Sequence, residues 1–164
     1  MRRWTINIFE KAQADEAESI AGGIFEFGNL IQQFPLGNKA SNMEIAIISY
    51  KAVLNIFTYE AFSQDWAATQ NNLGTAYRER IKGDKAENIE NAISSYNAAL
   101  QVYTQGAFPQ DWAATQNNLG TAYDNRIKGD KAENIEQAIS YYEVALQVRT
   151  REAFPQDWVY DTNN

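Results

Sequence analysis

Residues 67–112 read AATQNNLGTAYRERIKGDKAENIENAISSYNAALQVYTQGAFPQDW, and residues 113–158 read AATQNNLGTAYDNRIKGDKAENIEQAISYYEVALQVRTREAFPQDW. The two stretches match at 37 of 46 positions without a gap. An older, more divergent copy precedes them, because eight residues between Asn42 and Leu54 recur 46 positions later. Self-similarity at such a period is typical of stacked supersecondary units, so it decides the fold class before any helix is assigned.

Each unit contains two helical patterns. A stripe with the spacing i, i+4, i+7, i+11 and i+15, apolar except for a glutamine, shares one face of a first helix. Its members are Trp66, Gln70, Leu73, Tyr77 and Ile81. This helix is predicted to end at Lys82-Gly83-Asp84, which resembles a C-cap followed by a turn. A second stripe predicts the second helix, with members Ile89, Ala92, Ile93, Tyr96, Ala99, Leu100 and Tyr103.

The start of the second helix has two candidate positions, one turn apart. Asp84 with Glu87, and Asn134 with Gln137, both resemble the reciprocal pairs that cap helix N-termini. Pro109 suits the first turn of the next first helix, where a missing N–H costs nothing.

The chain is predicted to be one all-α domain, a solenoid of helix-turn-helix repeats. Residues 1–19 predict a decayed N-terminal helix, and residues 20–66 a degenerate repeat that Gly22 and Gly23 weaken by about 1 kcal/mol per glycine. Residues 67–112 and 113–158 are full repeats, and residues 159–164 form a tail. Phe154 to Trp158 would open a further first helix. Gly74 is predicted to lie at a close crossing between the two helices of its unit.

The composition excludes several function classes. The 164 residues include no cysteine and no histidine, so thiol or imidazole catalysis and Cys/His zinc sites are ruled out. The net charge of −7 argues against a nucleic-acid partner. No apolar run approaches the ~20 residues that span a bilayer, and no secretory signal is expected, so a cytoplasmic location is predicted. No cofactor, metal or membrane partner is expected, and an enzyme is not predicted.

The motifs resemble the tetratricopeptide repeat. Asn72-Leu73-Gly74-Thr75-Ala76-Tyr77, followed by Ala92-Ile93-x-x-Tyr96-x-x-Ala99-Leu100, is similar to that family's Leu-Gly-x-x-Tyr and Ala-x-x-x-Phe-x-x-Ala pattern. The resemblance covers roughly residues 20–158 and is strongest over residues 61–158. The 46-residue period and Asn71-Asn72-Leu73 are similar to the kinesin-light-chain-like branch and to bacterial, often cyanobacterial, arrays. HEAT and armadillo arrays have a suitable period but lack the Leu-Gly-x-x-Tyr signature.

The resemblance implies a scaffold that binds a partner peptide or protein in a concave groove lined by the first helices. It places Asn72 and Asn118 where an amide commonly holds the backbone of a ligand, and an amide offers both donors and an acceptor. The contact candidates are Asn71, Asn72, Thr75, Arg78, Glu79, Asn117, Asn118, Thr121, Asp124, Asn125 and Arg126.

Three alternatives stay open at this stage. The asparagines would equally serve to cap or brace adjacent helices. The replacement of Arg78 by Asp124, and of Glu79 by Asn125, between the two copies is either a specificity device or neutral drift on a solvated face. Finally, unpaired terminal helices would favour self-assembly into a homo-oligomer, through end-to-end docking or a domain swap, in place of peptide binding.

Overall fold

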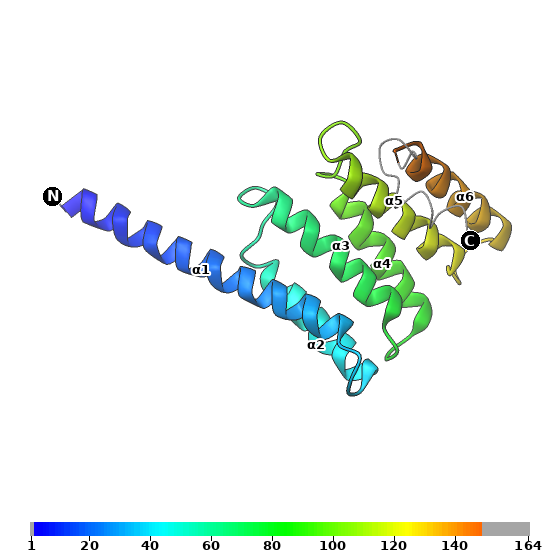
Figure 1. The fold of residues 1–164 in the computed structure, drawn as a ribbon, viewed down its shortest axis with the longest axis horizontal. Helices are drawn as coiled ribbons and strands as arrows, with labels where there is room; N and C mark the ends of the chain where they lie inside the picture. Colours follow the sequence, from blue (N-terminus) through cyan, green and yellow to red (C-terminus); the bar gives the residue numbers. More distant parts are fainter. Residues whose placement is uncertain (1, 149–164) are drawn as a thin grey trace.

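The computed structural model describes residues 2–148, which form helices joined by short loops, with no strand in that range (Figure 1). The helices are α1 (Arg2–Gln33), α2 (Lys39–Val53), α3 (Ser63–Glu79), α4 (Lys85–Ala99), α5 (Pro109–Asp124) and α6 (Lys131–Val148). The predicted all-α class is confirmed. Among these helices, none combines the length and the apolar character that crossing a bilayer requires.

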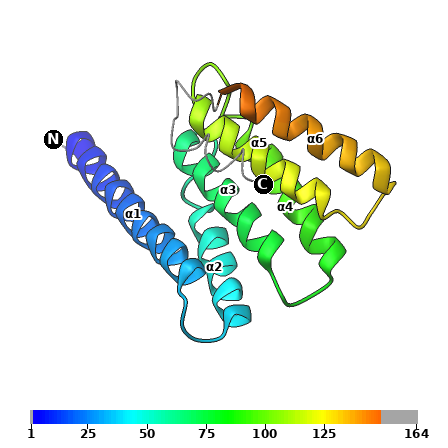
Figure 2. The same ribbon diagram turned by 45° about the vertical axis from the view of Figure 1, so that its right-hand side comes forward.

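The helices form three antiparallel pairs that stack side by side (Figures 1 and 2). Within the pairs, α1 packs on α2, α3 on α4 and α5 on α6; between the pairs, α2 packs on α3 and α4 on α5. One apolar cluster runs through the stack, from Ala46 on α2 to Ala122 on α5. The core is therefore a row of interfaces with one contribution from each unit, as expected of a solenoid.

A glycine and a tyrosine set the close crossing within each pair. A Cβ atom added at Gly74 would lie 2.7 Å from the Tyr96 ring, and one at Gly120 would lie 2.6 Å from Tyr142. The same contact, at 2.9 Å, joins Gly28 to the ring of Tyr50. The prediction for Gly74 is confirmed, and the contact recurs in the degenerate first pair, where the sequence reading did not identify it.

Each predicted first helix ends earlier than its apolar stripe. Helix α3 ends at Glu79, so Ile81 lies in the following loop, where it is 61% exposed. The proposed C-cap was also wrong, because Arg80 is the C-cap residue and Gly83, at φ +79°, lies within the turn. The Asn88 side chain closes this loop by donating to the Lys82 carbonyl (2.8 Å) and accepting from Arg80 (3.3 Å). These contacts with the loop, rather than the local pattern, end the helix.

The structure resolves the two candidate starts of the second helix. The Asp84 carboxylate accepts from the backbone N–H of Glu87 (2.8 Å) and is the N-cap of α4. Asp130 does the same for Glu133 at the start of α6 (3.0 Å). Asn134 is instead buried inside α6, where it donates to the Lys128 carbonyl as Asn88 does one unit earlier. Pro109 is confirmed in the first turn of α5.

The N-terminal region differs from the prediction of a separate decayed helix. Helix α1 runs without interruption from Arg2 to Gln33, and in Figure 1 its first half extends beyond the helices that it packs against. Gly22 and Gly23 lie inside this helix, and nothing within 4 Å would meet a Cβ atom on either. The two glycines therefore lower helix propensity without serving a close contact. Phe154 to Trp158 lie outside the described residues.

Candidate partner-binding face

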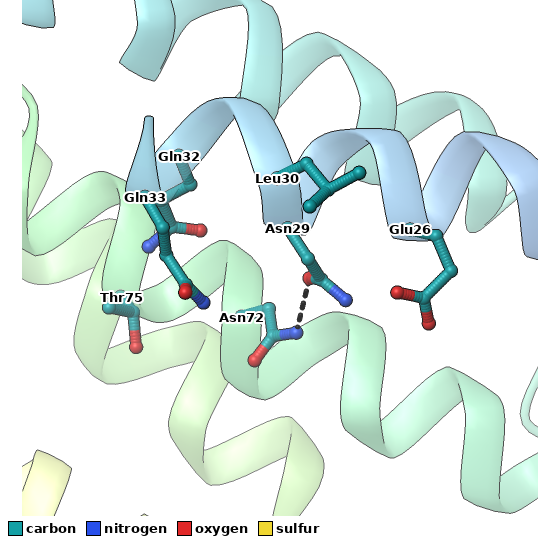
Figure 3. A pocket seen from close by; sticks show the side chains of 7 residues that line it. All are labelled: Glu26, Asn29, Leu30, Gln32, Gln33, Asn72 and Thr75. Atoms are coloured by element: carbon teal, nitrogen blue, oxygen red, sulfur yellow. Dashed lines mark hydrogen bonds between the residues drawn. The ribbon is translucent and has the colours of Figure 1, made fainter. Parts of the chain in front are cut away.

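The first helices α1, α3 and α5 follow one another along one side of the stack, here termed the first-helix face (Figure 2). A polar cavity of about 420 Å³ opens on this face between α1 and α3. Figure 3 shows the side chains that line it: Glu26, Asn29, Leu30, Gln32 and Gln33 from α1, with Asn72 and Thr75 from α3. Four of the seven are amides, so the cavity is rich in groups that can both donate to and accept from a peptide backbone.

Of the predicted contact residues, Asn72 and Thr75 line this cavity, and Asn72 also forms a hydrogen bond across it. Its Nδ2 donates to Asn29 Oδ1 at 2.8 Å, which joins α3 to α1 (Figure 3). Asn118 does the same between α5 and α3, since its Nδ2 donates to Asn71 Oδ1 at 3.2 Å. Asn72 and Asn118 therefore do brace adjacent helices, which was one of the alternatives for these asparagines. This bracing uses one amide N–H of each asparagine and, among the side chains that the structure describes, no hydrogen bond reaches Oδ1 of Asn72 or Asn118.

The two predicted threonines support the tyrosines of the crossings. Thr75 Oγ1 lies 3.1 Å from Tyr96 Oη, and Tyr142 Oη donates to Thr121 Oγ1 at 3.3 Å. Burial raises the pKa of the Tyr96 phenol above its ordinary value, which favours the protonated hydroxyl in this contact. The backbone carbonyl of Asn117 accepts from the Thr121 hydroxyl at 3.1 Å. These threonines link the first-helix face to the second helices beneath it.

The predicted charged residues lie toward the C-terminal ends of α3 and α5. Arg78 pairs with Glu79 at 3.6 Å, and Glu79 also lies 3.8 Å from Lys39 of the preceding pair. Asp124 ends α5 with its side chain exposed, and it forms no ion pair within residues 2–148. The exchange of Arg78 and Glu79 for Asp124 and Asn125 therefore replaces an ion pair by a single carboxylate and lowers the local charge by one.

Two predicted contact residues are engaged within their own chain. Asn125 is the C-cap residue of α5, and its Nδ2 donates to the Thr121 carbonyl at 2.7 Å. Arg126 lies beyond the helix, where its guanidinium donates twice to the Glu90 carboxylate of α4 (2.8 and 3.0 Å). The Asn125 bond closes the end of its own helix, and the Arg126 bonds join α5 to α4, so both contacts favour a structural role over a role in partner binding.

Sequence reasoning missed the contribution of α1 to the cavity, namely Asn29, Gln32 and Gln33. Asn29 lies 46 residues before Thr75, so the repeat period was the signal that could have identified it. The ion pair of Arg126 with Glu90 has a counterpart in Arg80 with Glu44, and both pairs span 36 residues. Among the described residues, no group of carboxylates could hold a metal ion.

Three antiparallel helix pairs that recur with a 46-residue period define a helix-pair repeat solenoid, a class whose functions reside on its extended surfaces. A family model described as tetratricopeptide repeat matches residues 66–102 and 112–153. The two matched stretches correspond to the two full repeats and support a tetratricopeptide repeat family for this part of the chain. The match does not distinguish the kinesin-light-chain-like branch from other branches. No curated protein and no solved structure matches the chain. Tetratricopeptide repeats are generally protein–protein interaction modules and typically act as scaffolds without catalytic activity.

Proposed function

We propose that the first-helix face binds a segment of a partner protein, with the cavity between α1 and α3 as its main contact. The observation that carries this proposal is the cavity lining, in which amide side chains of two successive first helices meet around Asn72. A peptide backbone needs an acceptor for each N–H and a donor for each carbonyl, and the free Oδ1 of Asn72 meets the first need.

Charge favours a basic segment as the partner. Glu26 projects at one end of the cavity and Asp124 is exposed on α5, and neither carboxylate forms an ion pair within residues 2–148. Arg78 of α3 is already next to Glu79. Charges of one sign select partners of the other sign and set the salt dependence of association. We therefore expect a lysine or arginine in the bound segment, with its stem against Leu30.

Affinities of peptides selected from a random display library test this proposal. Asn72→Ala is expected to weaken the selected peptides about tenfold, because it removes an acceptor from a desolvated contact. Gln33→Ala and Glu26→Gln are expected to weaken them as well. Among the described side chains, those of Gln33 and Glu26 form no hydrogen bond, so both variants separate binding from bracing.

Asn97→Ala is the matched control, because Asn97 is an exposed asparagine on α4, away from the cavity. Each variant is also compared in urea unfolding, since Asn72→Ala removes the bond to Asn29. Selected peptides that bind Gln33→Ala and Glu26→Gln as tightly as the wild-type chain would contradict the proposed site.

A further inference from the structure

The cavity between α1 and α3 lies next to a buried tyrosine hydroxyl. Tyr50 of α2 is fully buried, with its ring against Gly28. Its Oη lies 2.9 Å from Asn29 Oδ1 and 2.8 Å from Gln32 Oε1, and both amides line the cavity (Figure 3). Burial, and to a lesser extent the Glu26 carboxylate, raises the pKa of the Tyr50 phenol, which favours the protonated hydroxyl. One hydroxyl with one proton therefore joins the core to the cavity lining.

This proton cannot be donated to both amides at once. When Tyr50 donates to Asn29 Oδ1, the Gln32 amide turns its NH₂ group toward Tyr50 Oη, because two oxygens with no proton between them repel each other. When Tyr50 donates to Gln32 Oε1, the Asn29 amide turns instead. Half a turn about the last bond of an amide side chain exchanges its donor and its acceptor. The position of the proton therefore decides how Asn29 is oriented.

The orientation of Asn29 is passed on to α3 through Asn72. Asn72 Nδ2 donates to Asn29 Oδ1 at 2.8 Å, the same oxygen that faces Tyr50. In this arrangement Asn29 Nδ2 and Asn72 Oδ1 are left for a partner, so α1 offers a donor and α3 an acceptor. If Asn29 turns, its NH₂ group faces Tyr50 and Asn72, and Asn72 turns in order to accept. Helix α1 then offers the acceptor and α3 the donor.

The polarity of the two asparagines selects the direction of a bound backbone. In an extended segment the N–H and the C=O of one residue point to the same side, and the N–H lies nearer the N-terminus. A segment whose N–H meets Asn72 and whose C=O meets Asn29 therefore runs from α3 toward α1. With the opposite polarity of the asparagines, the segment runs from α1 toward α3.

The two later pairs lack such a relay. Thr75 and Thr121 stand at the position of Asn29, and each donates its hydroxyl proton to a carbonyl of its own helix. Tyr96 and Tyr142 each meet a threonine oxygen there, and a threonine has no amide that could turn. A choice of polarity is therefore a property of the first pair.

The position of Gln32 carries a different chemistry in each pair. Its counterparts, at intervals of 46 residues, are Arg78 and Asp124. An arginine only donates hydrogen bonds and a carboxylate only accepts them, whereas a glutamine does both. This place in the fold therefore accepts side chains of either charge, and the glutamine of the first pair is compatible with both positions of the Tyr50 proton.

We propose that Tyr50 and Gln32 determine the direction in which the cavity binds the backbone of a partner segment, an inference that rests on the proposed binding of a segment between α1 and α3. The segment presents one extended residue whose N–H and C=O are both directed at the cavity, so neither a proline nor an N-methylated residue fits there. Tyr50 and Gln32 act through Asn29 and Asn72 and are thus positioning residues.

Gln32→Lys and Gln32→Glu test the proposal, because each fixes the proton of Tyr50. A lysine only donates, so Tyr50 donates to Asn29 and segments that run from α3 toward α1 are favoured. A carboxylate accepts the proton, so the opposite direction is favoured. The probes are a peptide selected from a display library on the wild-type chain and a peptide of the reversed sequence. The ratio of their dissociation constants is expected to shift about tenfold between the two variants, the worth of roughly one hydrogen bond.

Gln33→Lys and Gln33→Glu are the matched controls. Gln33 is exposed and lines the same cavity, and Tyr50 donates to Gln32 and not to Gln33. The two probes have the same composition, so a change of charge at Gln33 is expected to alter both affinities and to leave their ratio unchanged. Tyr50→Phe keeps the ring against Gly28 and removes the proton. Added to either Gln32 variant, Tyr50→Phe is expected to abolish the shift in the ratio, and urea unfolding checks that each variant is folded.

Amide exchange measured by NMR on the full ¹⁵N-labelled chain tests the relay without any peptide. The side-chain amide proton that exchanges slowly is expected to belong to Asn72 in Gln32→Lys and to Asn29 in Gln32→Glu. A ratio that is the same in the two Gln32 variants, a reversed peptide that binds neither, or an identical exchange pattern in both overturns the proposal. If no peptide can be selected, the proposed function fails, whereas the exchange pattern still decides whether Gln32 controls the asparagines.

Discussion

The helix pairs α3–α4 and α5–α6 have nearly the same sequence and bury their side chains differently. Tyr96 of α4 is fully buried, whereas Tyr142, which makes the same contact with its glycine, is half-buried on α6. The difference comes from the neighbour, because α4 lies between α3 and α5 and no described helix follows α6. In a one-dimensional array the stability of a unit depends on its own pair and on the units beside it. Two units of nearly equal sequence therefore contribute differently to the free energy of unfolding.

The largest expected effect of this difference is at the paired isoleucines. Ile89→Ala is expected to cost about 3 kcal/mol of unfolding free energy, because it leaves a cavity in a fully enclosed site. Ile135→Ala is expected to cost less than about 1 kcal/mol, since much of that side chain is already in water. Urea unfolding with amide hydrogen exchange on each helix measures both. Equal losses would show that α6 is covered in solution.

A smaller effect is expected at the glycine–tyrosine crossings. Gly74→Ala places a Cβ atom 2.7 Å from a tyrosine that cannot move, and is expected to cost about 1–2 kcal/mol after the gain in helix propensity. Gly120→Ala is expected to cost less, because Tyr142 has room to shift. Gly22→Ala serves as the control and is expected to stabilise α1 by about 0.5–1 kcal/mol, since nothing opposes the added methyl group. Thermal unfolding of the three variants decides the order.

The smallest effect is expected at the ion pairs and depends on pH. The pKa of Glu44 is lower in the folded chain than its ordinary value of 4.5, because Arg80 donates hydrogen bonds to the carboxylate. The Glu44–Arg80 pair therefore makes its full contribution to the free energy of unfolding above about pH 5. This contribution is lost as the pH falls through the pKa of Glu44 in the folded chain. Arg80→Met is expected to cost about 0.5–1 kcal/mol at pH 7 and less at pH 3.

Glu136 sharpens the same comparison, because it has the position of Glu44 without an arginine among the described residues. At pH 7, Glu136→Gln is expected to lower the thermal midpoint by less than Glu44→Gln does, because Arg80 donates to Glu44 and no described arginine donates to Glu136. An equal loss at the two positions would reveal a cation bound to Glu136 in solution.

The 46-residue period and the 3.6-residue stripes were sufficient to predict the helices of the two full repeats, their pairing and the crossing at Gly74, but not the single long helix α1. Helix ends were not predictable in the same way. Ile81 continues the stripe by spacing, but contacts with residues outside the helix end it two positions earlier, through Glu44 and Asn88. Gly28 shows a different limit, since its neighbours diverged and only the period marks it.

For the candidate site, the residue types on the exposed side of the first helices follow from the sequence, and Asn72 and Thr75 do line a cavity. Local spacing does not say that Asn72 donates to Asn29, 43 residues away, or that Arg126 donates to Glu90. Helix periodicity depends on residues that are close together in the chain, so it can be predicted from the sequence alone. Which polar groups remain free for a partner depends on how successive units stack, and that is decided only when the units meet in space.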